Sequence, residues 1–171
     1  MALNYAPNID PALLITPIAV LVVDDQLAVR EGLARLITCA SIPLRAVCTA
    51  ATPAEALRMA QLHHPEVVVL DVDLAGEDGL TLLAHLSPAA GVLVLTSHGD
   101  SATRARAFLL GALAFIEKHQ PAADLLGAIV RVAHMQILHT QTRGDKAPGS
   151  HGTSPLPAVV AGSVVHASPS H

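Results

Sequence analysis

The 171-residue sequence has few aromatic and few charged residues. Tryptophan is absent and aromatic residues make up 2% of the chain, so we expect a core of aliphatic side chains. The formal net charge is -4, and an acidic chain with so few aromatic rings lacks the basic patch and the stacking surface that nucleic-acid binding needs. We therefore expect no direct binding of DNA or RNA. Hydrophobic residues make up 51%, which excludes a chain that is disordered throughout.

Cysteines and long apolar runs are also scarce. Cys39 and Cys48 form neither a disulfide framework nor a Cys-x-x-Cys metal site, and we expect both to be reduced and buried. The first apolar run, from Leu13 to Val23, is broken by Pro17 and ends on two aspartates, unlike a signal peptide or a membrane span. These absences predict a cytoplasmic protein without membrane association.

Composition divides the chain into three regions. Residues 1–16 contain two prolines and are expected to form a flexible leader. Residues 17–140 alternate short apolar runs with amphipathic segments, which predicts one domain of ordinary size. Residues 141–171 are rich in Gly, Ser, Pro, His and Ala, which predicts a low-complexity, disordered tail with no room for a helix-turn-helix domain.

Five short apolar runs predict buried parallel strands. They are rich in Val, Ile or Leu and lack the polar alternation of a strand with one face in water. The runs are Ile18 to Val23, Leu44 to Thr49, Val67 to Leu70, Val92 to Leu95 and Leu113 to Ile116.

The segments between these runs predict five helices. The first follows Gln26, and the second starts at residues 52–55 (Thr-Pro-Ala-Glu), a capping box with proline at the first helical position. The others are expected at about 80–86, 101–110 and 121–138. Strands that alternate with helices predict a doubly wound α/β fold, a five-stranded parallel sheet with helices on both faces. In such sheets ligands bind beyond the carboxyl ends of the strands.

Five polar residues stand at the carboxyl ends of the predicted strands. Asp24 and Asp25 follow the first strand, and Asp71 follows the third. Thr96 and Lys118 come at the ends of the fourth and fifth strands. Three carboxylates in one place resist full ionisation unless a cation or protons lie among them, and oxygen ligands suit Mg²⁺. A carboxylate nucleophile, Mg²⁺, a hydroxyl and a lysine are together the groups needed to form an aspartyl phosphate.

The same residues lie in motifs that resemble those of the response-regulator receiver domain of two-component signalling. The motifs are VLVVDDQ, VVVLDVDLAGEDGL, VLVLTSHGD and GALAFIEK, in that family's order and spacing over roughly residues 18–138. The resemblance implies a flavodoxin-like fold with strand order 2-1-3-4-5 and a phosphoprotein that requires Mg²⁺.

The resemblance also implies a role for each residue of the predicted site. Asp71 would be the phosphoacceptor, and Thr96 and Lys118 would hold the phosphoryl group. Phe115 would be the aromatic side chain that, together with Thr96, changes conformation on activation. The implied Mg²⁺ ligands are Asp24 (through water), Asp25, Asp71 and the backbone carbonyl of Asp73.

Three positions depart from the family pattern. Ala75 stands where the loop after the phosphoacceptor usually has proline, so we expect a looser loop. Phe115 has no hydroxyl and lacks the hydrogen bond that a tyrosine would make. His119 follows the lysine where many receivers have proline, and Pro121 comes later, a spacing typical of LuxR-type (NarL/FixJ-type) regulators.

We therefore predict a stand-alone response-regulator receiver that is not an enzyme. It would accept a phosphoryl group from a histidine kinase or a phosphotransfer protein and then switch a surface that binds an unknown downstream protein. The expected surface is formed by the fourth helix, with Arg104 and Arg106, the fifth strand and the fifth helix, and is also the expected dimer interface.

Two alternatives stay open. One is a truncated LuxR-type transcriptional regulator that keeps the receiver without its output domain. The other is a phosphatase of the haloacid-dehalogenase type, because VVVLDVDLAG resembles the DxD motif of those enzymes. In that case Asp71 would be the nucleophile and Asp73 the acid that protonates the leaving group.

Overall fold

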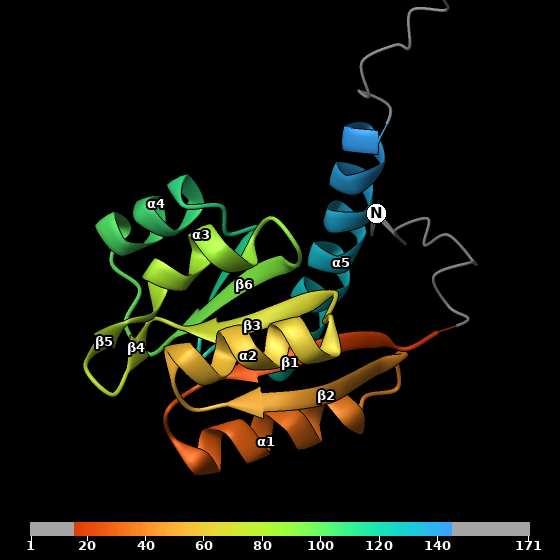
Figure 1. The fold of residues 1–171 in the computed structure, drawn as a ribbon. Helices are drawn as coiled ribbons and strands as arrows, with labels where there is room; N and C mark the ends of the chain where they lie inside the picture. Colours follow the sequence, from red (N-terminus) through yellow and green to blue (C-terminus); the bar gives the residue numbers. More distant parts are fainter. Residues whose placement is uncertain (1–15, 145–171) are drawn as a thin grey trace, which may run out of the picture.

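The fold comes from a computed structural model that describes residues 16–144 (Figure 1). The predicted leader, except its last residue, and residues 145–171 of the predicted tail lie outside this range. The strands of the main sheet are β1 (Ile18–Val23), β2 (Leu44–Ala50), β3 (Val67–Asp71), β6 (Gly91–Thr96) and β7 (Ala114–Glu117). They are the five strands predicted from the sequence, with small differences at their ends.

The main sheet is parallel throughout, and its strand order is β2-β1-β3-β6-β7. Numbered along the chain without the two short strands described below, this is the predicted 2-1-3-4-5 order. Because β2 and β3 lie on opposite sides of β1, the winding direction of the chain reverses at β1. The order confirms the doubly wound, flavodoxin-like topology and marks the carboxyl ends of β1 and β3 as the place to look for a site.

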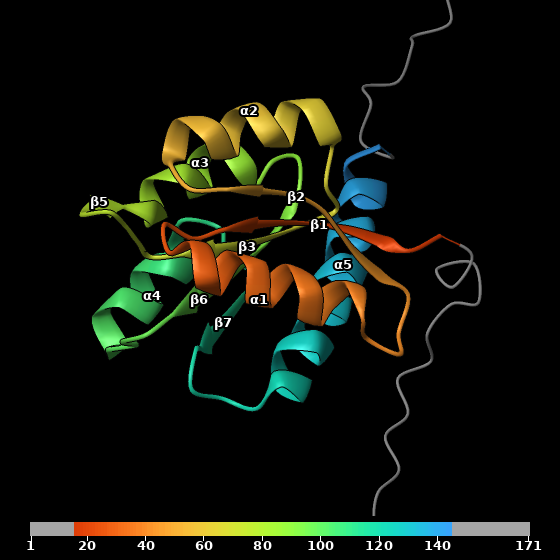
Figure 2. The same ribbon diagram turned by 90° about the horizontal axis from the view of Figure 1, so that it is seen from below.

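Helices cover both faces of this sheet (Figures 1 and 2). On one face lie α1 (Leu27–Thr38) and α5 (Ala122–Gly144), and on the other α2 (Pro53–His63), α3 (Leu83–Leu86) and α4 (Ser101–Leu109). Neighbouring residues of β1 point to opposite faces, since Leu21 packs with the α2 side and Val22 with the α1 side. The core on both faces is aliphatic except for Phe115, as the composition predicted.

A short hairpin after β3 was not predicted. β4 (Asp73–Leu74) and β5 (Glu77–Asp78) pair antiparallel, and a 3₁₀ helix, η2 (Gly79–Leu82), leads from them into α3. Strands of two residues are too short to show a hydrophobic alternation, so the pattern does not reveal them.

Helix α5 is longer than predicted. The sequence pattern placed its end near residue 138 and the tail from 141, but the helix continues to Gly144. Residues 139–143 contain neither glycine nor proline, and Thr140 Oγ1 donates a hydrogen bond to the carbonyl of Ile137 at 2.8 Å within the helix. Since Gly144 is the first residue there that favours a helix end, the first four residues of the predicted tail belong to α5.

The start of α2 confirms the predicted capping box. Thr52 Oγ1 accepts a hydrogen bond from the N–H of Glu55 at 3.2 Å. The Glu55 carboxylate reaches back to the N–H of Ala51 at 2.8 Å, one residue before the cap.

The expectation that both cysteines are buried was wrong. Both are free, but Cys39 is exposed and Cys48 is only partly buried. Cys39 is the residue that follows α1 as its C-cap, where the chain leaves the sheet face. Of the helices within residues 16–144, none combines the length and the apolar character needed to cross a membrane.

Gly79 marks a close backbone approach behind Asp71. A Cβ atom on Gly79 would lie 2.2 Å from the carbonyl oxygen of Asp71 and 3.0 Å from that of Val72. These are backbone atoms of the segment that carries Asp71, so they cannot turn aside as a side chain would. We predict that Gly79→Ala lowers the free energy of unfolding in urea by about 2 kcal/mol through overpacking.

Gly32→Ala is the matched control for that measurement. Gly32 is an exposed residue of α1, and a Cβ atom there would meet nothing within 4 Å. Alanine should therefore stabilise the helix by about 0.5–1 kcal/mol. A Gly79→Ala variant as stable as wild type would contradict the close approach.

Candidate functional site

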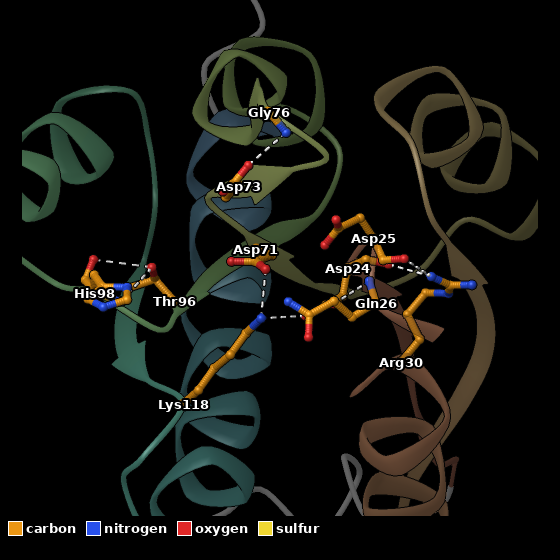
Figure 3. A network of polar contacts seen from close by, with 10 residues as sticks. All are labelled: Asp24, Asp25, Gln26, Arg30, Asp71, Asp73, Gly76, Thr96, His98 and Lys118. Atoms are coloured by element: carbon orange, nitrogen blue, oxygen red, sulfur yellow. Dashed lines mark hydrogen bonds and ion pairs between the residues drawn. The ribbon is translucent and has the colours of Figure 1, made fainter. Parts of the chain in front are cut away.

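One ammonium group bridges two buried carboxylates at the carboxyl edge of the sheet. Asp24 follows β1, Asp71 is the last residue of β3, and Lys118 follows β7. Lys118 Nζ lies 2.6 Å from Asp24 Oδ2 and 2.6 Å from Asp71 Oδ2 (Figure 3). The aspartates are 1% and 5% exposed, respectively. They lie 94 and 47 residues from the lysine along the chain, so the parallel sheet is what brings the three together.

The side chain of Asp25 completes an acidic cluster with Asp24 and Asp71. Each of the three offers a carboxylate oxygen, and these oxygens lie within 4.8 Å of one another. A set of carboxylate oxygens without nitrogen or sulfur suits a hard cation such as Mg²⁺ or Ca²⁺ rather than a softer metal such as Zn²⁺ or Cu²⁺. The three carboxylates outnumber the single ammonium among them, so a divalent cation would reduce an excess of negative charge. The residues therefore fit the Mg²⁺ ion that the sequence predicted.

Burial and the neighbouring charges shift the pKa values of this pair. Burial raises the pKa of Asp71 above its ordinary value of 3.8 and the charge of Asp24 adds to the rise. The hydrogen bond and charge of Lys118, and the backbone N–H of Asp73, oppose that rise without cancelling it. Burial alone would lower the pKa of Lys118, but hydrogen bonds and charges from the two aspartates raise it above 10.5. Lys118 therefore remains a cation at neutral pH.

The backbone at Asp24 is held from several sides. Its N–H donates to the carbonyl of Ala50 in β2 at 3.1 Å, and its Oδ1 accepts from the N–H of Gln26 at 2.9 Å. Arg30 Nη1, from α1, donates to the carbonyl oxygen of Asp24 at 2.7 Å and to that of Asp25 at 3.0 Å. Arg30 is not among the site residues predicted from the sequence, although an arginine in the first turns of the helix that follows the acid pair was a signal.

Asp73 lies in the hairpin rather than in the acidic cluster. Its side chain is exposed, and Oδ1 accepts from the N–H of Gly76 at 2.9 Å (Figure 3). Ala75 and Gly76 form the two-residue turn, with φ angles of 57° and 86°. Because proline has φ fixed near −65°, it could not replace Ala75 in this turn. Alanine in place of the family's usual proline at position 75 thus coincides with a tight hairpin turn in the left-handed conformation.

Thr96 occupies the predicted position, but its hydroxyl does not face Asp71. The residue ends β6 and is buried, and its backbone carbonyl accepts from the N–H of Lys118 at 2.7 Å. Its Oγ1 lies 3.2 Å from the carbonyl oxygen of His98, to which it donates, and 3.3 Å from the N–H of His98, from which it accepts (Figure 3). The hydroxyl is therefore engaged with the loop that leads to α4.

Phe115 is buried in β7, and the residues that contact its ring were not predicted from the sequence. The guanidinium carbon of Arg104, on α4, lies 4.6 Å from the centre of the ring, a cation–π contact. Arg104 Nη2 also pairs with Glu117 Oε1 at 3.3 Å. A Cβ atom on Gly99 would lie 2.9 Å from the Phe115 ring and 2.8 Å from Glu117 Oε1, so the loop before α4 closes tightly on both.

The model of the response regulator receiver domain family matches residues 20–130. The chain belongs to this family. The match confirms the resemblance, and the strand order of the sheet agrees with it.

A curated relative of this receiver is protein-glutamate methylesterase/protein-glutamine glutaminase 2 from Nitratidesulfovibrio vulgaris. The two are 37% identical over 120 residues, which are 67% of this chain and 32% of the relative. The chain thus spans about a third of that relative's length.

Two solved structures share the receiver fold. The receiver domain of NarL from Mycobacterium tuberculosis has a TM-score of 0.65 and 27% identity, and the likeness covers 70% of this chain and 98% of that one. It confirms the predicted similarity to LuxR-type (NarL/FixJ-type) receivers. A response regulator from Burkholderia pseudomallei, crystallised with a phosphorylated aspartic acid, a calcium ion and citrate, has a TM-score of 0.59 and 27% identity over 75% of each chain.

We predict that the stability of this receiver falls with rising pH because of Asp71. Its folded pKa lies above 3.8, so the folded state binds the proton more tightly than the unfolded state. The free energy of unfolding should therefore fall as pH rises from about 3.8 through the folded pKa, and Asp71→Asn should abolish that fall. At neutral pH, Mg²⁺ at ten times its Kd should raise the free energy of unfolding of wild type by about 1.4 kcal/mol and that of Asp71→Asn by less.

Asp100→Asn provides a control of opposite sign. Hydrogen bonds from Thr103, chiefly from its backbone N–H, lower the pKa of Asp100 below 3.8. Ionised Asp100 therefore stabilises the folded state above pH 3.8, and this stabilisation is lost as the pH falls. Chemical denaturation across the pH range measures the free energy of unfolding of wild type, Asp71→Asn and Asp100→Asn. A fall with pH that persists in Asp71→Asn would show that another group causes it.

Proposed function

We propose that this receiver is a phosphorylation-controlled switch of a two-component pathway, with Asp71 as the phosphoacceptor. The observation that carries the proposal is Lys118 Nζ, 2.6 Å from a carboxylate oxygen of Asp71 and 2.6 Å from one of Asp24. A charged lysine beside a buried carboxylate is positioned to hold a phosphoryl oxygen. The similar Burkholderia protein, which contains a phosphorylated aspartic acid and a calcium ion, supports the same chemistry.

The proposed donor is the phosphohistidine of a histidine kinase or a phosphotransfer protein. A carboxylate oxygen of Asp71 attacks phosphorus, and the new P–O bond forms as the P–N bond to the donor imidazole breaks. The imidazole nitrogen keeps the electron pair of that bond and takes up a proton. Hydrolysis by water later returns the carboxylate and releases inorganic phosphate. The chain thus modifies itself, and we do not propose that it is an enzyme with a separate substrate.

Mg²⁺ is the proposed cofactor, and when bound it would neutralise charge on the phosphoryl oxygens. Its proposed ligands are Asp24 (through water), Asp25, Asp71 and the backbone carbonyl of Asp73, of which the three carboxylates form the cluster described above. Lys118 holds one phosphoryl oxygen. The hydroxyl of Thr96 holds another after it leaves His98.

Thr96 and Phe115 form the proposed switch. When the Thr96 hydroxyl turns to the phosphoryl group, it gives up both contacts with the backbone of His98 in the loop before α4. That loop packs against Phe115, and Arg104 joins the ring to α4. Phosphorylation therefore shifts the population between two packings of α4 against β7.

The proposed output surface is formed by α4, β7 and α5. On α4 the side chains of Phe108 and Leu109 are 46% and 87% exposed, beside Arg104 and Arg106. Apolar side chains next to arginines are suited to a protein partner, either a downstream protein or a second copy of the chain. We propose a cytoplasmic location for this exchange, with protein rather than nucleic acid or membrane as the partner.

The haloacid-dehalogenase alternative requires the Asp73 carboxyl as an acid next to Asp71. That side chain is exposed and bonded to the turn of the hairpin. Its position supports the receiver function over the phosphatase.

We predict that the full chain gains one phosphoryl group when it is incubated with acetyl phosphate and Mg²⁺. Intact-mass spectrometry measures the gain, and the modification should be labile to hydroxylamine, as an acyl phosphate is. Asp71→Asn should show no gain, because the nucleophile is removed. Asp73→Asn is the matched control, and it should be modified as wild type is, since its backbone carbonyl remains.

Two results would overturn the assignment of Asp71. One is a phosphoryl group that persists in Asp71→Asn under the same conditions. The other is multiple turnover of a phosphate ester such as p-nitrophenyl phosphate that Asp73→Asn abolishes, which would identify a phosphatase.

A further inference from the structure

Arg30 contacts the acidic loop through its backbone and not through its carboxylates. Its Nη1 donates to the carbonyl oxygens of Asp24 and Asp25 at 2.7 and 3.0 Å. Within residues 16–144, no ion pair joins Arg30 to either carboxylate. An arginine beside two aspartates would ordinarily pair with a carboxylate, so this arrangement leaves the carboxylate oxygens available to other groups.

The available oxygens are those that the proposed site uses. Asp24 Oδ2 contacts Lys118 Nζ, and Asp24 Oδ1 accepts from the N–H of Gln26. Asp25 is partly exposed, and its carboxylate lies with those of Asp24 and Asp71 in the acidic cluster. In Figure 3, Arg30 lies on the far side of Asp24 and Asp25 from Lys118.

Two successive peptide carbonyls are fixed by one nitrogen atom of Arg30. The N–H of Asp24 is fixed as well, by the carbonyl of Ala50 at 3.1 Å. The backbone N–H of Arg30 donates to the carbonyl of Gln26 at 3.0 Å, which anchors the arginine to the first turn of α1. The backbone dihedral angles at an aspartate set the direction of its Cα–Cβ bond and restrict the rotamers that its side chain can adopt.

From this geometry we infer that Arg30 is a positioning residue for the divalent-cation site: it holds the backbone of Asp24 and Asp25 so that their carboxylates converge with that of Asp71. The inference rests on the proposed function, since it concerns the cation of that site. It assigns Arg30 a role that acts through the two aspartates, without contact between the guanidinium and the ion.

The sign of the effect separates positioning from a simple effect of charge. Arg30 is a cation near a cation site, so its charge alone opposes Mg²⁺ binding, and removal of that charge would tighten binding. Loss of positioning has the opposite effect, because groups that orient metal ligands typically contribute 10-fold to 100-fold to affinity. Arg30→Met retains most of the apolar length of the side chain and removes both the charge and the hydrogen bonds.

The test is a titration of the full-length protein with MgCl₂ at constant ionic strength, followed by ¹H–¹⁵N NMR. We expect the Kd for Mg²⁺ to rise about 10-fold or more in Arg30→Met. Without Mg²⁺, the amide of Gln26 should exchange with solvent faster in the variant, because Asp24 Oδ1 is its acceptor. Arg35→Met is the matched control, since Arg35 is an exposed arginine of the same helix, and it should bind Mg²⁺ as wild type does.

Arg30→Lys keeps the test decisive if Arg30→Met does not fold. Lysine retains the charge but is shorter and lacks the planar guanidinium that bonds to both carbonyls, so the Kd of Arg30→Lys for Mg²⁺ should lie above that of wild type. An unchanged or lower Kd in Arg30→Met, or a wild-type Kd in Arg30→Lys if the methionine variant is unfolded, would overturn the inference and leave the proposed function intact. Absence of Mg²⁺ binding by wild type would overturn both.

Discussion

The functional edge of this receiver depends on one interaction, the contact of the Lys118 ammonium with the carboxylates of Asp24 and Asp71. A buried carboxylate without a cation is costly, and here two lie side by side. The ammonium stabilises both at once, at 2.6 Å from each. It thereby fixes the ends of β1, β3 and β7 relative to one another and keeps Asp71 in a site with more negative than positive charge. An excess of negative charge of this kind favours the binding of a divalent cation.

The same edge is connected to α4 by two arginines. Arg104 packs over Phe115 and pairs with Glu117 on β7. Arg106 pairs with Asp78 at 2.5 Å, and Asp78 belongs to the hairpin that follows Asp71. Helix α4 is thus joined both to the strand that carries the aromatic residue and to the hairpin that follows Asp71, the proposed phosphoacceptor. Surface ion pairs of this kind contribute little to stability, about 1 kcal/mol or less, so breaking them costs little free energy.

Much of the fold and part of the site could be predicted from the sequence for physical reasons. Apolar runs of Val, Ile and Leu identify buried parallel strands, and in a parallel sheet every carboxyl end lies at one edge. Asp24, Asp71 and Lys118 were therefore expected at the same edge of the sheet once the strands were identified. The likeness to a known family added the strand order and the roles of the residues.

The other parts of the site, and the hairpin beside it, depend on geometry that no periodic sequence pattern encodes. The hydroxyl of Thr96 bonds to His98, a choice of side-chain rotamer that the position of the residue does not determine. The hairpin at Asp73 rests on two-residue strands and on the left-handed conformation of Ala75. The contacts of Arg30 with backbone carbonyls depend on how α1 is placed against the loop before it. Side-chain contacts between elements follow from packing rather than from spacing along the chain.

The most direct measurement of the central claim is a crystal structure of the protein with Mg²⁺ and beryllofluoride, a mimic of the phosphoryl group. We expect beryllium bonded to a carboxylate oxygen of Asp71, Lys118 Nζ in contact with one fluoride, and Thr96 Oγ1 turned from His98 to another. Beryllofluoride bound away from Asp71, or bound to it with Lys118 and Thr96 still in their present contacts, would exclude the proposed switch.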